Sequence, residues 1–299
     1  MKNHLLNFLK GICIGIANVI PGFSGGTMAV LLKIYDLFVY AFANIFNDFK
    51  NVIKKCWSLF IGILAGILVA LITIVKLLEV IPFITIMFFV GLILGSIPSI
   101  YKNAKQGKLK IADIIGLVLA IAVMVILLFI QTNNAETLDT NFWIYIIMFL
   151  MGAICSSAMV IPGVSGSLVL MAFGYYAFFM NTMKEFLINI FNFSLDNYWS
   201  NFFMLVSFAL GCVLGLVFIS KLIIKLTDKY PKTVYFTILG LLLASPFSII
   251  YSTLGEYTIT FDIPTIIFSI ISCVLGVSVV LAGEYFSNKM NKKLKDSEN

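Results

Sequence analysis

Two short stretches, IPGFSGGT at residues 20–27 and IPGVSGSL at residues 161–168, interrupt segments that are otherwise apolar. Each stretch has a Pro-Gly pair followed by small residues, some with hydroxyl groups. A helix cannot run through Pro-Gly without losing backbone hydrogen bonds, so each stretch predicts a broken helix. Inside a membrane such a break is tolerated only where the freed backbone faces protein or water. Matching breaks in two halves of a chain are typical of a transporter's binding site.

The composition is that of an integral membrane protein. Of the 299 residues, 61% are apolar and 11% are charged, whereas soluble domains have about 25% charged residues. All 20 basic residues are lysines and the one histidine is His4, so the chain has no arginine clamp for phosphate and no internal histidine base. The five cysteines are isolated in apolar sequence, and we expect no metal and no cofactor. The lysines lie at the ends of apolar runs, which indicates membrane topology and not nucleic-acid binding.

The two halves of the chain repeat one pattern. Residues 11–25 align with 152–166 at an offset of 141, and residues 62–113 align with 211–262 at an offset of 149. We interpret this as a duplication of the whole chain. The predicted units are a first repeat at 1–141, a second repeat at 142–286 and a cytoplasmic tail without regular structure at 287–299.

Six segments are long and apolar enough to cross a bilayer core, which takes about 20 helical residues. They lie at about 57–78, 82–101, 111–131, 201–222, 233–251 and 263–285. The segments that hold the two Pro-Gly stretches, about 5–43 and 146–183, are predicted to be hairpins that enter and leave the membrane on the same side. The predicted fold is an all-α integral membrane protein with an inverted-topology repeat, in which each half is a re-entrant helical hairpin plus three transmembrane helices.

The lysine positions favour this topology. Lysines cluster within 50–55, 102–110, 221–232 and 289–295, whereas the loops at 131–140, 191–200 and 252–262 contain none. Three crossings in each half put every cluster on one side and every lysine-free loop on the other. By the positive-inside rule the clusters, and with them the N- and C-termini, are cytoplasmic.

The residues after each Pro-Gly pair have the chemistry of an anion site. The first backbone N–H groups of a helix have no intrahelical partner, and the helix dipole adds partial positive charge there. Glycines allow a ligand to approach the backbone. The alternative is a packing turn capped by its own hydroxyl groups. The candidate binding residues are Asn18, Pro21, Gly22, Ser24, Gly25, Gly26, Thr27, Pro162, Gly163, Ser165, Gly166 and Ser167.

Asn18 and four charged residues are further candidates. Asn18 either binds substrate or braces the opposite hairpin. Lys33 either neutralises a phosphate or extends to the cytoplasmic interface, and Asp36 has the helical spacing to pair with it. Asp36, Glu79 and Glu284 are the candidates for proton coupling, because carboxylates within membranes often have that role.

ANVIPGFSGGTMAVLLKIYD (17–36) and SAMVIPGVSGSLVLMAFGYY (157–176) resemble the paired signatures of the DUF368 family of bacterial membrane proteins. The resemblance covers essentially the whole chain. It implies a transporter, not an enzyme, that returns undecaprenyl phosphate, a polyprenyl-phosphate lipid carrier of the cell envelope, across the cytoplasmic membrane. The chain departs from the family pattern at Lys33, where the family carries glycine, as at Gly174. We expect alternating access with the head group held at paired hairpin tips, and the oligomeric state is open.

Two other functions are compatible with parts of this pattern. A transporter or channel for a small soluble anion would also use helix N-termini. Undecaprenyl-pyrophosphate phosphatase combines inverted repeats with a similar loop, but its chemistry needs an arginine in that loop and paired glutamates nearby. Here the loops read SGGT and SGSL, with no arginine and no acidic residue beside them, which disfavours the phosphatase.

Overall fold

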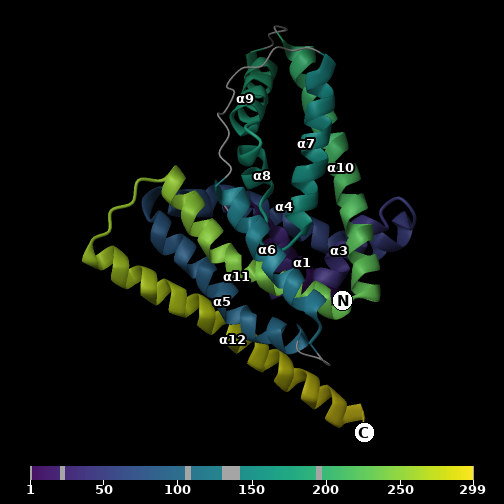
Figure 1. Cartoon of the computed structure of the whole chain (residues 1–299), viewed down its shortest axis with the longest axis vertical. Helices are drawn as coiled ribbons and strands as arrows, with labels where there is room; N and C mark the ends of the chain where they lie inside the picture. The colour runs from purple at the N-terminus through teal and green to yellow at the C-terminus, as the bar shows by residue number, and fades with distance from the viewer. Residues whose placement is uncertain (1, 21–23, 105–108, 130–141, 193–196, 299) are drawn as a thin grey trace.

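The computed structural model is all-helical in the residues that it describes, which are 2–20, 24–104, 109–129, 142–192 and 197–298 (Figure 1). Seven of these helices, α4 to α7 and α10 to α12, are long and apolar enough to cross a membrane. The protein is therefore an all-α, multi-pass membrane protein, as predicted. The helices are α1 (Lys2–Val19), α2 (Gly25–Leu31), α3 (Tyr35–Ala43), α4 (Phe49–Val80), α5 (Pro82–Ala104), α6 (Ile111–Phe129), α7 (Phe142–Val160), α8 (Gly166–Ala172), α9 (Tyr176–Asn192), α10 (Tyr198–Lys229), α11 (Pro231–Glu256) and α12 (Ile263–Glu298).

Several helices extend beyond the predicted apolar spans. α4 begins at Phe49 and not near residue 57, and α10 continues to Lys229 and not to residue 222. Once a helix has formed, each added residue costs little, and lysine is a good helix former. For the same reason α12 continues to Glu298. The prediction of an irregular tail at 287–299 was therefore wrong for all but residue 299, which lies outside the described residues.

Helix pairing follows the same plan in the two halves of the chain. α1 packs along α4, and α7 packs along α10. The last helix of each half packs on the other half, since α6 lies against α11 and α12 lies against α5 (Figure 1). α5 and α11 contact each other. Each half therefore supplies one helix that packs against the other half.

Glycines bring the paired helices close together, because a residue without a side chain lets two backbones approach each other. A Cβ atom on Gly15 would overlap the carbonyl oxygen of Ile63, and one on Gly66 would overlap that of Ile12. In the second half, a Cβ on Gly211 would overlap the carbonyl oxygen of Phe149. These glycines belong to the packing of the scaffold.

Both broken segments have one feature that was not predicted. The helix that follows each break has only 7 residues, in α2 and again in α8. It ends in a left-handed residue, Lys33 at φ 52° or Gly174 at φ 78°, and a third helix follows. Each segment is therefore helix, break, short helix, turn, helix.

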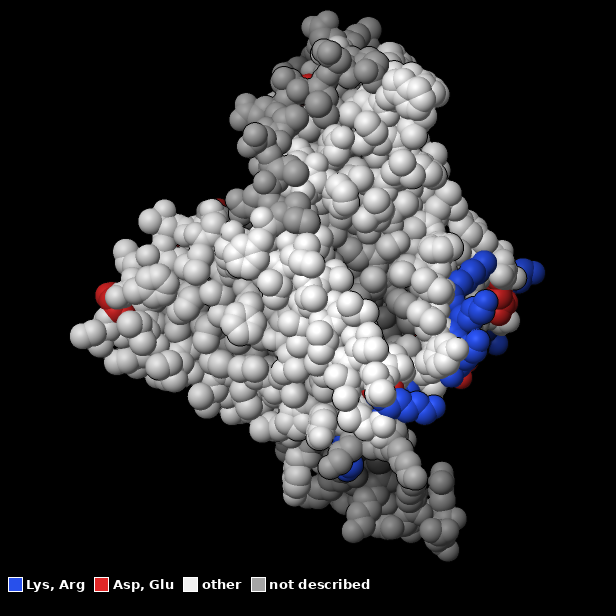
Figure 2. All heavy atoms as spheres, in the orientation of Figure 1, with Lys and Arg blue, Asp and Glu red and all other residues white. Residues whose placement is uncertain are grey.

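Lysines gather at one edge of the visible face (Figure 2). They lie over the region where Figure 1 shows α3 and the lower end of α10, while the connection from α11 to α12 is at the opposite end. This separation agrees with the predicted grouping of lysines on one side of a membrane.

Candidate functional site

The two Pro-Gly stretches, here called the first motif (residues 20–27) and the second motif (residues 161–168), contact each other. Thr27 Oγ1 accepts a hydrogen bond of 2.6 Å from the N–H group of Gly163. Thr27 is fully buried, as is the backbone around Gly163. Pro21 and Gly22 lie outside the described residues, whereas Pro162 is described and buried. The breaks of the two halves thus meet in the interior through one polar contact.

The first motif is capped by its own side chains. Ser24 has the extended backbone of an N-cap, with φ −119° and ψ 150°, and its Oγ accepts a hydrogen bond of 3.2 Å from the N–H group of Thr27. The N–H group of Gly25 donates to Asn18 Oδ1 at 3.0 Å. Asn18 therefore braces its own segment, and not the opposite one as one alternative proposed. The amides of Gly25 and Thr27 both have protein partners in this conformation.

The second motif is capped differently. Ser165 also has extended backbone, with φ −95° and ψ 137°, but its side chain makes no capping hydrogen bond. Ser165 Oγ instead lies 2.8 Å from Ser167 Oγ. Gly163 has φ +89°, a conformation that favours glycine. Capping by a hydroxyl group of the motif, the alternative given for both stretches, is thus present at Ser24, whereas Ser165 makes no capping hydrogen bond.

A second contact joins the first segment to the end of α7. A Cβ atom on Gly26 would lie 2.5 Å from the carbonyl oxygen of Val160, so the two backbones touch at this point. The same carbonyl accepts a hydrogen bond of 3.3 Å from the hydroxyl of Tyr35. Gly26 was a candidate from the sequence, but Tyr35 was missed, since a tyrosine at the start of an apolar helix carries no distinguishing signal.

The charged candidates are not buried with the motifs. Lys33, Asp36 and Glu79 are exposed. Lys33 occupies the left-handed turn before α3 and Asp36 the first turn of that helix, so the two do not share a helix and the predicted spacing argument does not apply. Glu284 lies on α12, and its side chain is outside the described residues.

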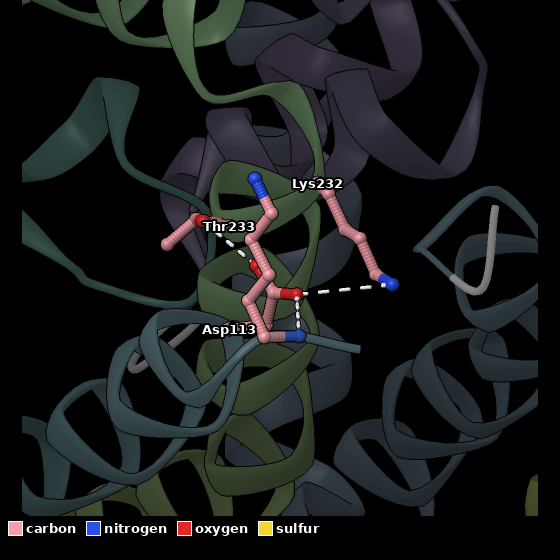
Figure 3. A network of polar contacts seen from close by, with 4 residues as sticks. Asp113, Lys232 and Thr233 are labelled. Atoms are coloured by element: carbon pink, nitrogen blue, oxygen red, sulfur yellow. Dashed lines mark hydrogen bonds and ion pairs between the residues drawn. The ribbon is translucent and has the colours of Figure 1, made fainter. Parts of the chain in front are cut away.

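One buried carboxylate was not among the candidate site residues from the sequence. Asp113 at the start of α6 is 1% exposed. As Figure 3 shows, its oxygens accept hydrogen bonds from Thr233 Oγ1 at 2.7 Å and from the Lys110 N–H group at 2.9 Å, and Lys232 Nζ lies 3.8 Å away. These partners offset the cost of burying the charge and tie α6 to α11.

Asp262, which aligns with Asp113, caps α12 through the N–H group of Thr265 at 3.1 Å and is exposed. Asp262 precedes its helix and caps it, whereas Asp113 lies in the first turn of α6 and accepts from the Lys110 N–H group before that helix. The burial of Asp113 depends on α11, far along the chain, and no local signal predicts it.

Comparison of the sequence with models of protein families finds a match. The family model described as VCA0040-like, undecaprenyl phosphate translocase-like, matches residues 14–260, a span that includes both motifs. The chain belongs to this family. The resemblance drawn from the motifs is therefore confirmed.

Two curated relatives of this undecaprenyl phosphate translocase-like chain are named polyprenyl-phosphate transporters. The protein of Vibrio cholerae serotype O1 (strain ATCC 39315 / El Tor Inaba N16961) is 29% identical over 259 residues, which cover 81% of this chain and 76% of the relative. The protein of Staphylococcus aureus (strain NCTC 8325 / PS 47) is 27% identical over 261 residues, which cover 82% and 85%. No solved structure matches the chain.

Proposed function

We propose that this protein transports a polyprenyl phosphate, such as undecaprenyl phosphate, across the bacterial cytoplasmic membrane and performs no chemistry on it. The observation that carries the proposal is the buried hydrogen bond between Thr27 and Gly163, which joins the broken helices of the two halves. Polar backbone is tolerated at membrane depth where it lines a substrate path. The names of the two relatives support the lipid as the substrate.

The proposed architecture is an inverted repeat. The segments α1–α3 and α7–α9 enter the membrane from opposite sides as re-entrant hairpins, and both termini are cytoplasmic. The matched helix pairing of the halves and the gathering of lysines at one edge support this arrangement. α7 has 19 residues, so its length also permits a full crossing, and labelling must decide. A cysteine introduced at residue 135 that reacted only from the cytoplasm would overturn the inverted repeat.

In the proposed mechanism, the contact between the motifs is the closed barrier. Thr27 and the amides of Gly25 and Gly163 bond to protein groups here. Separation of the motifs would free the Gly163 amide and the Thr27 hydroxyl for the phosphate oxygens, in a low-dielectric setting where hydrogen bonds to charged groups are strong. The proposed head-group residues are those predicted from the sequence in both motifs, together with Asn18.

An asymmetry between the halves supports alternating access. α3 packs on α10, but among the described residues α9 makes no comparable contact with α4. If the repeats exchange conformations, the second contact forms as the first opens, and the site faces the other leaflet. Proton coupling through Asp36, Glu79 or Glu284, and a role for Lys33, stay predictions.

The test is reconstitution of the purified protein in liposomes with a polyprenyl phosphate whose head group is labelled for leaflet position. We expect movement of the label between leaflets, with no release of phosphate. Parallel liposomes loaded with chloride or inorganic phosphate test the small-anion alternative. Movement of these ions without movement of the lipid would falsify the proposal.

A further inference from the structure

A groove of about 750 Å³ lies away from the motif contact, between the end of α3 and the end of α10. Tyr40, Asn44 and Asn47 line it on one side, and Lys221, Lys225 and Lys229 line it on the other. None of these residues belongs to either motif. The volume is within the range of about 300–1,000 Å³ that small-molecule sites occupy. Figure 2 shows the lysine-rich edge of the molecule to which α3 and the end of α10 contribute.

The charge of the groove is strongly positive. Lys221, Lys225 and Lys229 recur every four residues, so they lie along one face of α10. The groove is lined by one carboxylate, Asp228. In the part of the chain that the structure describes, Lys221 and Lys225 have no carboxylate within ion-pair distance. Neighbouring like charges at this spacing repel each other, and an anion bound between them would relieve the repulsion.

The nearby groups add to this potential. Lys55 Nζ lies 5.1 Å from the centre of the Tyr40 ring, which places another cation at the rim. On the α3 side, Asp48 accepts hydrogen bonds from Tyr40 Oη at 3.3 Å and from the Asn51 amide at 2.9 Å. The carboxylate of Asp48 is thus held by neutral donors on its own side of the groove.

The groove also has apolar surface. Ala43 and Ile224 line it between the polar side chains. A ligand that joins a phosphate to a hydrocarbon chain would match both kinds of surface, whereas inorganic phosphate would leave the apolar part wet. Lysines at a helix C-terminus complement the helix dipole and mark the cytoplasmic side of a membrane protein, but neither effect requires a groove with this mixed lining.

The repeat does not reproduce the groove in the other half. Lys225 aligns with Lys76, but Lys221 aligns with Ile72 and Lys229 aligns with Val80. On the facing helix, Glu185 aligns with Asn44. A feature needed only for folding of the repeat would be expected in both halves. The basic groove therefore belongs to one side of the molecule alone.

We propose that this groove binds the phosphate monoester head group of a polyprenyl phosphate, with Lys221 and Lys225 as its main ligands, before the lipid reaches the motifs. The inference rests on the proposed function. It assigns a loading site to the side where the lysines gather.

The experiment measures binding of a fluorescent polyprenyl phosphate to the full chain in phosphatidylcholine nanodiscs. K221Q/K225Q removes two charged contacts and should raise Kd at least about 10-fold. K50Q/K54Q removes the same charge from exposed lysines outside the groove and should stay within about 2-fold of the parent protein. K221R/K225R keeps the charge and should bind within a few fold. Equal binding by the parent protein and K221Q/K225Q would overturn the proposal that this groove binds the head group.

Competition separates the possible sources of phosphate. We expect unlabelled polyprenyl phosphate to displace the probe at a concentration at least about 10-fold below that of phosphatidylglycerol or inorganic phosphate. Equal displacement by either competitor would contradict the proposal, because the groove would then be a general anion surface. If the parent protein moves the lipid in liposomes and K221Q/K225Q binds normally, the groove fails and the proposed function stands. If K221Q/K225Q loses binding but the parent protein moves no lipid, the proposed function fails instead.

Discussion

At the first motif, Ser24 caps α2 and Asn18 accepts from the Gly25 amide, whereas at the second motif Ser165 makes no capping bond. The second motif depends on the first for one hydrogen bond, because the Gly163 amide donates to Thr27. Leu168 stands where Thr27 stands in the first motif, so the reciprocal bond cannot form. The comparison teaches that similar sequences in two repeats can divide one task, with the first motif supplying hydroxyl groups to both.

The largest expected effect comes from Gly26→Ala. Its Cβ would lie 2.5 Å from the Val160 carbonyl oxygen, so the two motif segments must move apart. We expect a loss of about 3 kcal/mol in the free energy of unfolding, at the upper end of overpacking costs. Thermal unfolding in detergent measures it. The control is Gly255→Ala, because a Cβ there meets nothing within 4 Å. Equal loss in both variants would contradict a special role of the motif contact, because alanine favours a helix over glycine at both positions.

Thr27→Val tests the hydrogen bond between the motifs. The change keeps the shape of the side chain but leaves the Gly163 N–H group buried without its acceptor. We expect a cost of about 2 kcal/mol, and faster hydrogen exchange at the Gly163 amide. Thr27→Ser restores the hydroxyl and should restore protection of that amide. Unchanged exchange in Thr27→Val would mean that the contact does not hold the motifs together in the membrane.

The sequence predicted the breaks and the approximate spans, because Pro-Gly pairs and apolar length act locally. It did not predict the partner of Thr27, which lies 136 residues away. Nor did it predict the burial of Asp113, which requires Thr233 from another helix. These contacts depend on how the halves assemble, and no local pattern records that. The substrate-binding role of the motif residues stays a prediction, and the sequence did not predict the hydrogen bonds that these residues make.

Ser24→Ala and Ser165→Ala compare the two caps directly. Ser24→Ala removes an N-cap hydrogen bond and should cost about 1 kcal/mol. Ser165→Ala removes a hydroxyl that makes no cap, and its partner Ser167 is partly exposed, so we expect less than about 0.5 kcal/mol. The two free energies of unfolding are measured under one condition. Equal losses would argue that Ser165 caps α8 in solution.

The smallest effect concerns the two left-handed turns. Lys33 and Gly174 close α2 and α8 in the same way, since their N–H groups donate to Val30 and Met171 at 3.0 and 2.9 Å. Left-handed backbone costs a residue with a side chain about 1 kcal/mol, partly offset by the greater freedom of glycine in the unfolded chain. We therefore expect Lys33→Gly to stabilise by about 0.5 kcal/mol and Gly174→Ala to destabilise by about the same amount.

Lys33→Ala is the control for this pair, because it removes the charge and keeps a Cβ in the left-handed turn. If backbone strain is the cause, chemical unfolding should show stabilisation by Lys33→Gly and little change in Lys33→Ala. Equal stabilisation by both variants would assign the effect to the lysine charge. In that case Lys33 would not strain its turn. The two turns would then have the same backbone energy, although one has lysine and the other has glycine.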